Sequence, residues 1–167
     1  TFIGELGGTI TDRVKAIGSA FEEAGMHCIV SDNIMGVIWD KLLVNVATGA
    51  VCGITHLPYG DMYQEDKLVA TAVAAVQEGM DVAAKAGVKL TYSDPMDVLE
   101  LARAGLPYDF KPSILQSLEK HRPTEVGVIN GAVVAQGAKH GVATPVNETL
   151  VACVTGIERY IREYINK

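Results

Sequence analysis

A lysine and an asparagine in one apolar helical segment are the first candidates for chemistry in this sequence. Lys41 and Asn45 are four residues apart, so they project from the same face of a helix predicted to begin at Asp32. They lie beside an apolar stripe of that helix, which consists of Ile34, Ile38, Leu42 and Val46. A lysine at the edge of an apolar surface is a potential proton donor, and a neighbouring asparagine can orient it or a substrate oxygen. The structural alternative is a solvated lysine paired with Asp40 or Asp32.

Glu125 is the second candidate, because a carboxylate there interrupts an apolar pattern. It falls in line with Ile129 and Val133 of a helix predicted from about Pro123 to His140. Buried carboxylates are usually paired or functional. The alternative is that an acidic residue in the first turn after Pro123 stabilises the helix dipole and has no catalytic role.

Two small polar residues, Ser113 and Asn130, lie in the same part of the sequence. The default roles are a cap or turn for the serine and a backbone hydrogen bond for the asparagine. The four histidines have no HxH, HxxxH or HExxH spacing, so the sequence gives no support for a metal site. Residues 4–8 read GELGG, which is not GxGxxG, and neither a P-loop nor GxSxG occurs. We therefore assign no cofactor-binding residue within this chain.

The first 31 residues have the pattern of an α/β unit. A short strand at residues 1–3 is followed by a helix from Thr9 or Thr11 to Gly25 and a second short strand at 27–30. We expect this unit to pack against a sheet that lies outside the chain. The division predicted from the pattern is thus 1–31 and 32–167.

From residue 32 onward the pattern is helical. We expect a turn at Pro58-Tyr59-Gly60 and irregular structure at 105–122. The predicted helices cover about 32–52, 65–86, 95–104, 123–140 and 145–165. The fold class is therefore mostly α, with the α/β unit in front of the helical part.

Composition restricts the class of protein. The chain has 167 residues, 49% of them hydrophobic and 20% charged, which is typical of a globular protein. A net charge of −6 argues against nucleic acid or anionic lipid as the main partner. No window approaches the roughly 18 uninterrupted apolar residues of a membrane span. Cys28, Cys52 and Cys153 have apolar neighbours, which favours buried free thiols in a reducing, cytoplasmic setting.

Three segments of the sequence resemble the C-terminal domain of ketopantoate reductases (2-dehydropantoate 2-reductases). Residues 38–45, IWDKLLVN, are similar to the W-x-K-L-x-x-N pattern of the family's helical domain. Residues 122–131, RPTEVGVING, match the family signature R-x-T-E-I-D-x-I-N-G, and residues 141–147, GVATPVN, match a later G-V-x-x-P-x-N segment. The resemblance implies a multi-helix domain of the 6-phosphogluconate-dehydrogenase C-terminal type. It also implies that residues 1–31 are the end of an N-terminal Rossmann-type domain.

The resemblance also implies roles for four residues. Lys41 would be the general acid that protonates the ketone oxygen of a 2-keto acid, and Asn45 would contact that lysine or the substrate hydroxyl. Glu125 would bind the hydroxyl end of the substrate, and Ser113 would lie near its carboxylate. NADPH would be held mainly by the preceding domain, so this chain alone would be inactive. The implied reaction is the reduction of ketopantoate to pantoate in pantothenate biosynthesis.

The sequence departs from the family pattern at three positions. Gly49 stands where many members have a second asparagine, Tyr59 where members often have an asparagine, and Gly127 replaces the aspartate of the signature. These departures leave a different 2-keto acid open as the substrate. A non-catalytic helical dimerisation module is a third hypothesis. The resemblance further implies a possible homodimer, for which the alanine-rich helix at 65–86 is a candidate surface.

Overall fold

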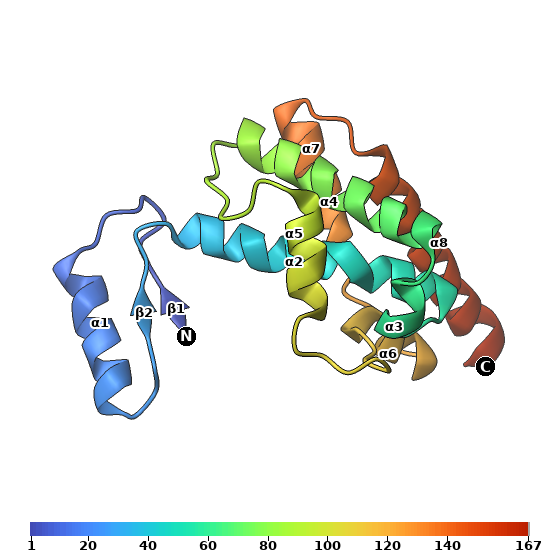
Figure 1. Cartoon of the computed structure of the whole chain (residues 1–167), viewed down its shortest axis with the longest axis horizontal. Coiled ribbons are helices and arrows are strands. Elements are labelled where there is room, and N and C mark those ends of the chain that lie inside the picture. The colour runs from blue at the N-terminus through green and yellow to red at the C-terminus, as the bar shows by residue number, and fades with distance from the viewer. Residues whose placement is uncertain (167) are drawn as a thin grey trace.

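The computed structural model describes residues 1–166, which form a small β–α–β unit followed by a helical body (Figure 1). Strand β1 (Phe2–Ile3) pairs in parallel with β2 (Ile29–Val30), and α1 (Asp12–Glu23) connects them. The Thr11 side chain caps α1 by accepting a hydrogen bond from the Val14 backbone N–H at 3.3 Å. The predicted strand, helix and strand are therefore confirmed. Figure 1 shows this unit at one end of the molecule, with α2 leading from it into the helical body.

The rest of the described chain is helical, which confirms the predicted fold class. The helices are α2 (Ile34–Thr55), α3 (Tyr59–Met62), α4 (Asp66–Lys85), α5 (Pro95–Arg103), α6 (Ser113–Glu119), α7 (Asn130–His140) and α8 (Pro145–Tyr160), and the π-helical segment η1 (Ile161–Ile165) follows α8. At the start of α5 the side chain of Asp94 accepts from the Met96 N–H at 2.8 Å, as its place before Pro95 predicts.

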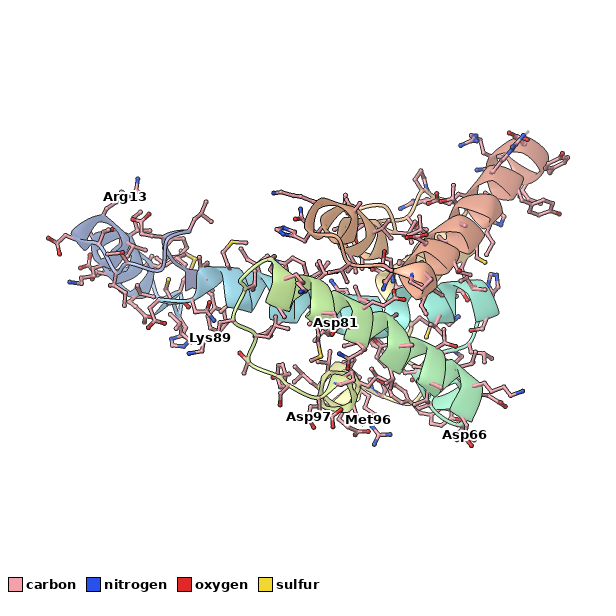
Figure 2. All side chains as sticks on the ribbon, turned by 90° about the horizontal axis from the view of Figure 1, so that it is seen from above. Arg13, Asp66, Asp81, Lys89, Met96 and Asp97 are labelled. Carbon is pink, nitrogen blue, oxygen red and sulfur yellow. The ribbon has the colours of Figure 1, made fainter. Side chains whose placement is uncertain are left out.

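Helix α2 is the core of the helical body. It packs against α4, α5, α6 and α8, and Figure 2 shows α4 running alongside it, with Asp81 and Asp66 labelled on α4. By length and composition α2 also qualifies as a possible membrane span, but over half of it is buried inside the protein, as expected for a core helix. The predicted stripe is only partly buried, because Ile34 and Val46 are buried but Ile38 is 51% exposed. The buried line includes Trp39, Leu43, Val46, Ala47 and Ala50.

Four further predictions about local structure were wrong. Helix α2 is capped by Asn33 and not by Asp32, since the Asn33 side chain accepts from the Gly36 N–H at 3.3 Å. The helix predicted from residue 123 begins only at Asn130, and the segment predicted to be irregular contains α6. Cys153 is exposed, whereas Cys28 and Cys52 are buried free thiols as predicted.

Small residues allow the helices around α2 to approach it closely. A Cβ at Gly53 would lie 2.7 Å from Ile114 Cγ2 of α6, and a Cβ at Gly79 of α4 would lie 2.5 Å from Leu43 Cδ2. Helix α4 therefore packs closely against α2. Ala72, Ala75 and Ala83 of α4 are fully buried within this chain, so they do not form the dimer surface expected from them. The homodimer remains a prediction without support from these alanines.

We predict opposite effects for the same substitution at two helical glycines. Gly53→Ala should destabilise the protein by about 1–3 kcal/mol, because the new methyl group meets Ile114 and Leu118. Gly156→Ala, on α8 with nothing within 4 Å, should stabilise it by up to about 1 kcal/mol. Urea unfolding of both variants measures the difference. Equal free energies of unfolding for the two variants would contradict the close α2–α6 contact.

Candidate active site

Three of the four predicted site residues line one cavity. The cavity has a volume of about 420 Å³, and it is bordered by Lys41 and Asn45 of α2 and Ser113 of α6. Glu125 is not among its lining residues. Thr48 adds a fourth polar side chain, and much of the remaining wall is apolar: Val44, Ala102, Leu106, Phe110, Pro112 and Ile129. A mostly apolar hollow with a few convergent polar groups is the usual form of a small-molecule site.

Lys41 lies at the solvent side of this cavity with its ammonium group unpaired. Its side chain is exposed, and among residues 1–166 it forms no salt bridge with Asp40, Asp32 or any other acid. The Asp40 carboxylate accepts instead from the Thr91 backbone N–H, at 3.2 and 3.3 Å. The structural alternative of a Lys41–Asp40 pair is therefore wrong. The ammonium is available to a negatively charged or polarised oxygen in the cavity.

Ser113 is the first residue of α6, and its hydroxyl is not used as a cap. The N-cap position is Pro112, and no side chain caps this helix. Within the described part of the chain the Ser113 hydroxyl makes no hydrogen bond that would hold it elsewhere. The default cap role is thus wrong, and the hydroxyl is available at the cavity wall.

Sequence reasoning did not identify a buried hydroxyl pair in the same cavity. The Thr48 hydroxyl and the Tyr59 hydroxyl are 2.6 Å apart, and both residues line the cavity. Thr48 continues the line of Lys41 and Asn45, since positions i, i+4 and i+7 share a helix face. That spacing is the signal in the sequence that would have identified it. Tyr59 gives no comparable signal, because it contacts α2 only through the tertiary fold.

The ring of Tyr59 is fixed by its neighbours. Its backbone N–H donates to the Phe110 carbonyl at 3.0 Å, and its ring meets the rings of Phe110 and Tyr63 edge-on, with centroids 5.0 and 6.0 Å away. Burial raises the pKa of the Tyr59 hydroxyl, and the hydrogen bond to Thr48 opposes this in part. The phenol is therefore neutral and can act as a hydrogen-bond donor at physiological pH.

Tyr108 fixes the loop before α6 next to Tyr59. The Gly60 N–H donates to the Tyr108 carbonyl at 2.8 Å, and a Cβ at Gly60 would lie 2.2 Å from the Tyr108 ring, so only glycine fits there. The Tyr108 hydroxyl donates to Asp61 at 2.7 Å, and this hydrogen bond raises the pKa of Tyr108. A second hollow of about 370 Å³ lies beyond, and Tyr59 and Leu106 border both hollows.

Glu125 and Asn130 have positions different from those that the pattern predicted. Glu125 is exposed in the turns before α7, where its carbonyl accepts from the Val128 and Ile129 N–H groups. It is neither buried nor in the first turn of a helix. Asn130 is buried, and its side-chain amide donates to Asn147 Oδ1 at 3.0 Å. The Asn147 side chain in turn donates to Glu78 and the Ala75 carbonyl, so this network joins α7, α8 and α4.

The described residues give little support for thiol chemistry or for a metal site. Burial raises the pKa of the Cys52 thiol to about 12, so this thiol is protonated and unreactive at neutral pH. Among residues 1–166 no group of three or more histidine, cysteine, aspartate or glutamate side chains is arranged to hold a metal ion.

Comparison with known proteins decides the family. The family model described as the ketopantoate reductase PanE/ApbA C terminal matches residues 33–158, a range that includes all four predicted site residues and the Thr48–Tyr59 pair. The chain belongs to the ketopantoate reductase family. A 2-dehydropantoate 2-reductase of Archaeoglobus fulgidus is 30% identical over 158 residues, which is 95% of this chain and 52% of the relative. The chain thus spans about half the length of the curated relatives that it matches.

Solved structures agree with this assignment. A ketopantoate reductase from Ralstonia eutropha superposes with a TM-score of 0.83 at 28% identity, over 97% of this chain and 52% of that protein. The complex of D-mandelate dehydrogenase with NADH superposes with a TM-score of 0.84 at 27% identity, over 96% of this chain and 54% of that protein. The fold is therefore shared by proteins whose names refer to different substrates.

Because burial raises the pKa of Tyr59, we predict a loss of stability at alkaline pH. The unfolded chain ionises this phenol near its usual pKa of about 10 and the folded chain does so at higher pH. The stability that the neutral phenol contributes to the fold is thus fully present below about pH 10 and decreases as the pH rises above it. Tyr59→Phe should flatten the fall in the free energy of unfolding over this range, and Tyr160→Phe, at an exposed position, should not. An equally steep fall in Tyr59→Phe would contradict the prediction.

Proposed function

We propose that this chain is the substrate-binding and proton-donating part of an NADPH-dependent oxidoreductase that reduces a 2-keto acid. The favoured reaction is 2-dehydropantoate (ketopantoate) to pantoate, a step of pantothenate biosynthesis. The observation that supports this proposal most directly is that Lys41, Asn45 and Ser113 line one and the same cavity. Its volume of about 420 Å³ suits a small organic acid.

The proposed mechanism gives Lys41 the role of general acid. When bound, NADPH supplies a hydride to the keto carbon. As negative charge develops on the keto oxygen, the Lys41 ammonium stabilises it and transfers a proton to it. Asn45, one turn away on α2, orients the lysine or the same oxygen. Ser113, with its hydroxyl uncommitted to a helix cap, donates to the substrate carboxylate.

We assign the cofactor to a preceding Rossmann-type domain, of which residues 1–31 form the end, with 32–167 as the helical domain. The sequence has no GxGxxG for the pyrophosphate. The β–α–β unit exposes a set of apolar side chains suited to a larger sheet and its covering helices: Phe2, Leu6, Ile10, Ile17 and Ile29. Lys41 is on the solvent side of the cavity, which is where a hydride donor from another domain has access.

A different 2-keto acid is the alternative substrate. Tyr59 and Phe110 form an edge-to-face aromatic wall where the family pattern often has an asparagine at residue 59. An asparagine at position 49 would have to push aside the Ile114 side chain of α6, because a Cβ there would lie 3.1 Å from Ile114 Cδ1. D-mandelate dehydrogenase, a structural neighbour, acts on an aromatic hydroxy acid by its name.

The test of Lys41 uses the full-length protein with its upstream domain, assayed by NADPH oxidation with a panel of 2-keto acids. Lys41→Ala should lower kcat by about 100- to 10,000-fold, the usual value of a general acid. Lys85→Ala removes an exposed lysine at the end of α4 and should leave kcat unchanged. The two variants should unfold at the same temperature as the unmodified protein.

Three results of this assay would overturn parts of the proposal. Unchanged kcat in Lys41→Ala would exclude the mechanism. Reduction of another 2-keto acid with no signal from ketopantoate would change the substrate. No NADPH oxidation with any acid of the panel would favour the non-catalytic helical module, and the same series with NADH checks the cofactor.

A further inference from the structure

The polar line on α2 ends at the buried hydroxyl pair. Lys41 is exposed, Asn45 is half-buried and Thr48 is 1% exposed, so the line runs from the mouth of the cavity to its floor. At a rise of 1.5 Å per residue, the Thr48 backbone is about 10 Å further along α2 than that of Lys41. The long lysine side chain spans part of this distance. A substrate whose keto oxygen contacts Lys41 therefore directs its opposite end toward Thr48 and Tyr59.

The hydroxyl pair has one more hydrogen than its own contact uses. Thr48 and Tyr59 each carry one hydroxyl hydrogen, and their 2.6 Å hydrogen bond uses only one of the two. Within the described chain neither hydroxyl has another hydrogen-bond partner. Three other helical threonines donate to the carbonyl four residues earlier: Thr55, Thr71 and Thr149. Thr48 does not, so the second hydrogen of the pair is available to an oxygen in the cavity.

The surroundings of the pair determine which kind of oxygen fits. Val44, Phe110 and Ile129 line the cavity with apolar surface, and among residues 1–166 Lys41 is the one charged lining residue. Within the described chain no carboxylate lines this cavity to bind an ammonium group, and no cation besides Lys41 lines it to bind a second carboxylate. A neutral hydroxyl oxygen suits this environment, because it can accept from the pair without bringing a charge into the apolar floor.

We propose, resting on the proposed function, that Thr48 and Tyr59 are specificity-determining residues that hydrogen-bond a hydroxyl group on the side chain of the 2-keto acid. This assigns the hydroxyl end of the substrate to the Thr48–Tyr59 pair. The family resemblance assigns it to Glu125, which is exposed and outside the cavity lining in this chain. A dry site built to bind a hydroxyl group discriminates against the analogue that lacks it.

The experiment compares ketopantoate with its analogue that lacks only the hydroxyl, 3,3-dimethyl-2-oxobutanoate, as substrates of the full-length enzyme. The unmodified enzyme should prefer the hydroxylated acid in kcat/KM by about 10- to 100-fold. Tyr59→Phe and Thr48→Val should bring this ratio close to one, mainly through KM, while turnover of the analogue stays within about threefold. Thr48→Ser keeps the hydroxyl group and should retain the preference for the hydroxylated acid.

Two control variants separate the possible outcomes. Tyr63→Phe removes a neighbouring phenol hydroxyl that donates to the Leu99 carbonyl and does not line this cavity, so it should leave the ratio unchanged. If the preference in kcat/KM for the hydroxylated acid persists in Tyr59→Phe and Thr48→Val but is lost in Glu125→Gln, the proposed Thr48–Tyr59 subsite is wrong, while the proposed reductase activity is unaffected. A kcat/KM ratio near one in the unmodified enzyme would also overturn the subsite. Failure to reduce either acid would overturn the proposed function and the subsite together.

Discussion

The burial of α2 is the constraint on which the rest of the structure depends. Twelve of its 22 residues are buried, and helices α3, α4, α5, α6 and α8 pack against it. Close packing requires small side chains where neighbours approach, and Gly49 and Gly53 meet that need opposite Ile114 of α6. The same contact brings Ser113, the first residue of α6, to the cavity that Lys41 and Asn45 border. The packing of α2 thus determines both the core contacts and the position of the candidate active site.

The sequence predicted the elements well where local physics decides them. Helices α1 and α5 each carry their own start signal, Thr11 for α1 and the Asp94-Pro95 pair for α5. The buried face of α2 was predicted less well. Residues chosen at steps of four drift by about 40° per step around a helix of 3.6 residues per turn. The line that starts at Ile34 therefore passes through the exposed Ile38 and reaches the core face of Trp39 and Leu43 only at Val46.

The candidate site was predictable only in part. Lys41 and Asn45 share a helix face by spacing alone, and the family resemblance identified Ser113. The helical pattern around Glu125 was misleading, because residues 126–129 form turns closed by hydrogen bonds to the Glu125 carbonyl and contain Gly127, a poor helix former. The Thr48–Tyr59 contact joins α2 to α3 across a turn. Only the tertiary fold makes that pairing visible.

The central claim is that the line of Lys41, Asn45 and Thr48 on α2 binds one small acid along its length. A crystal structure of the full-length protein with pantoate and the oxidised cofactor tests this most directly. We expect the C2 oxygen within hydrogen-bond distance of Lys41 Nζ, about 3 Å, and the side-chain hydroxyl at the same distance from Thr48 Oγ1 or Tyr59 Oη. Pantoate bound outside this cavity, or inside it with Lys41 beyond contact, would contradict the account.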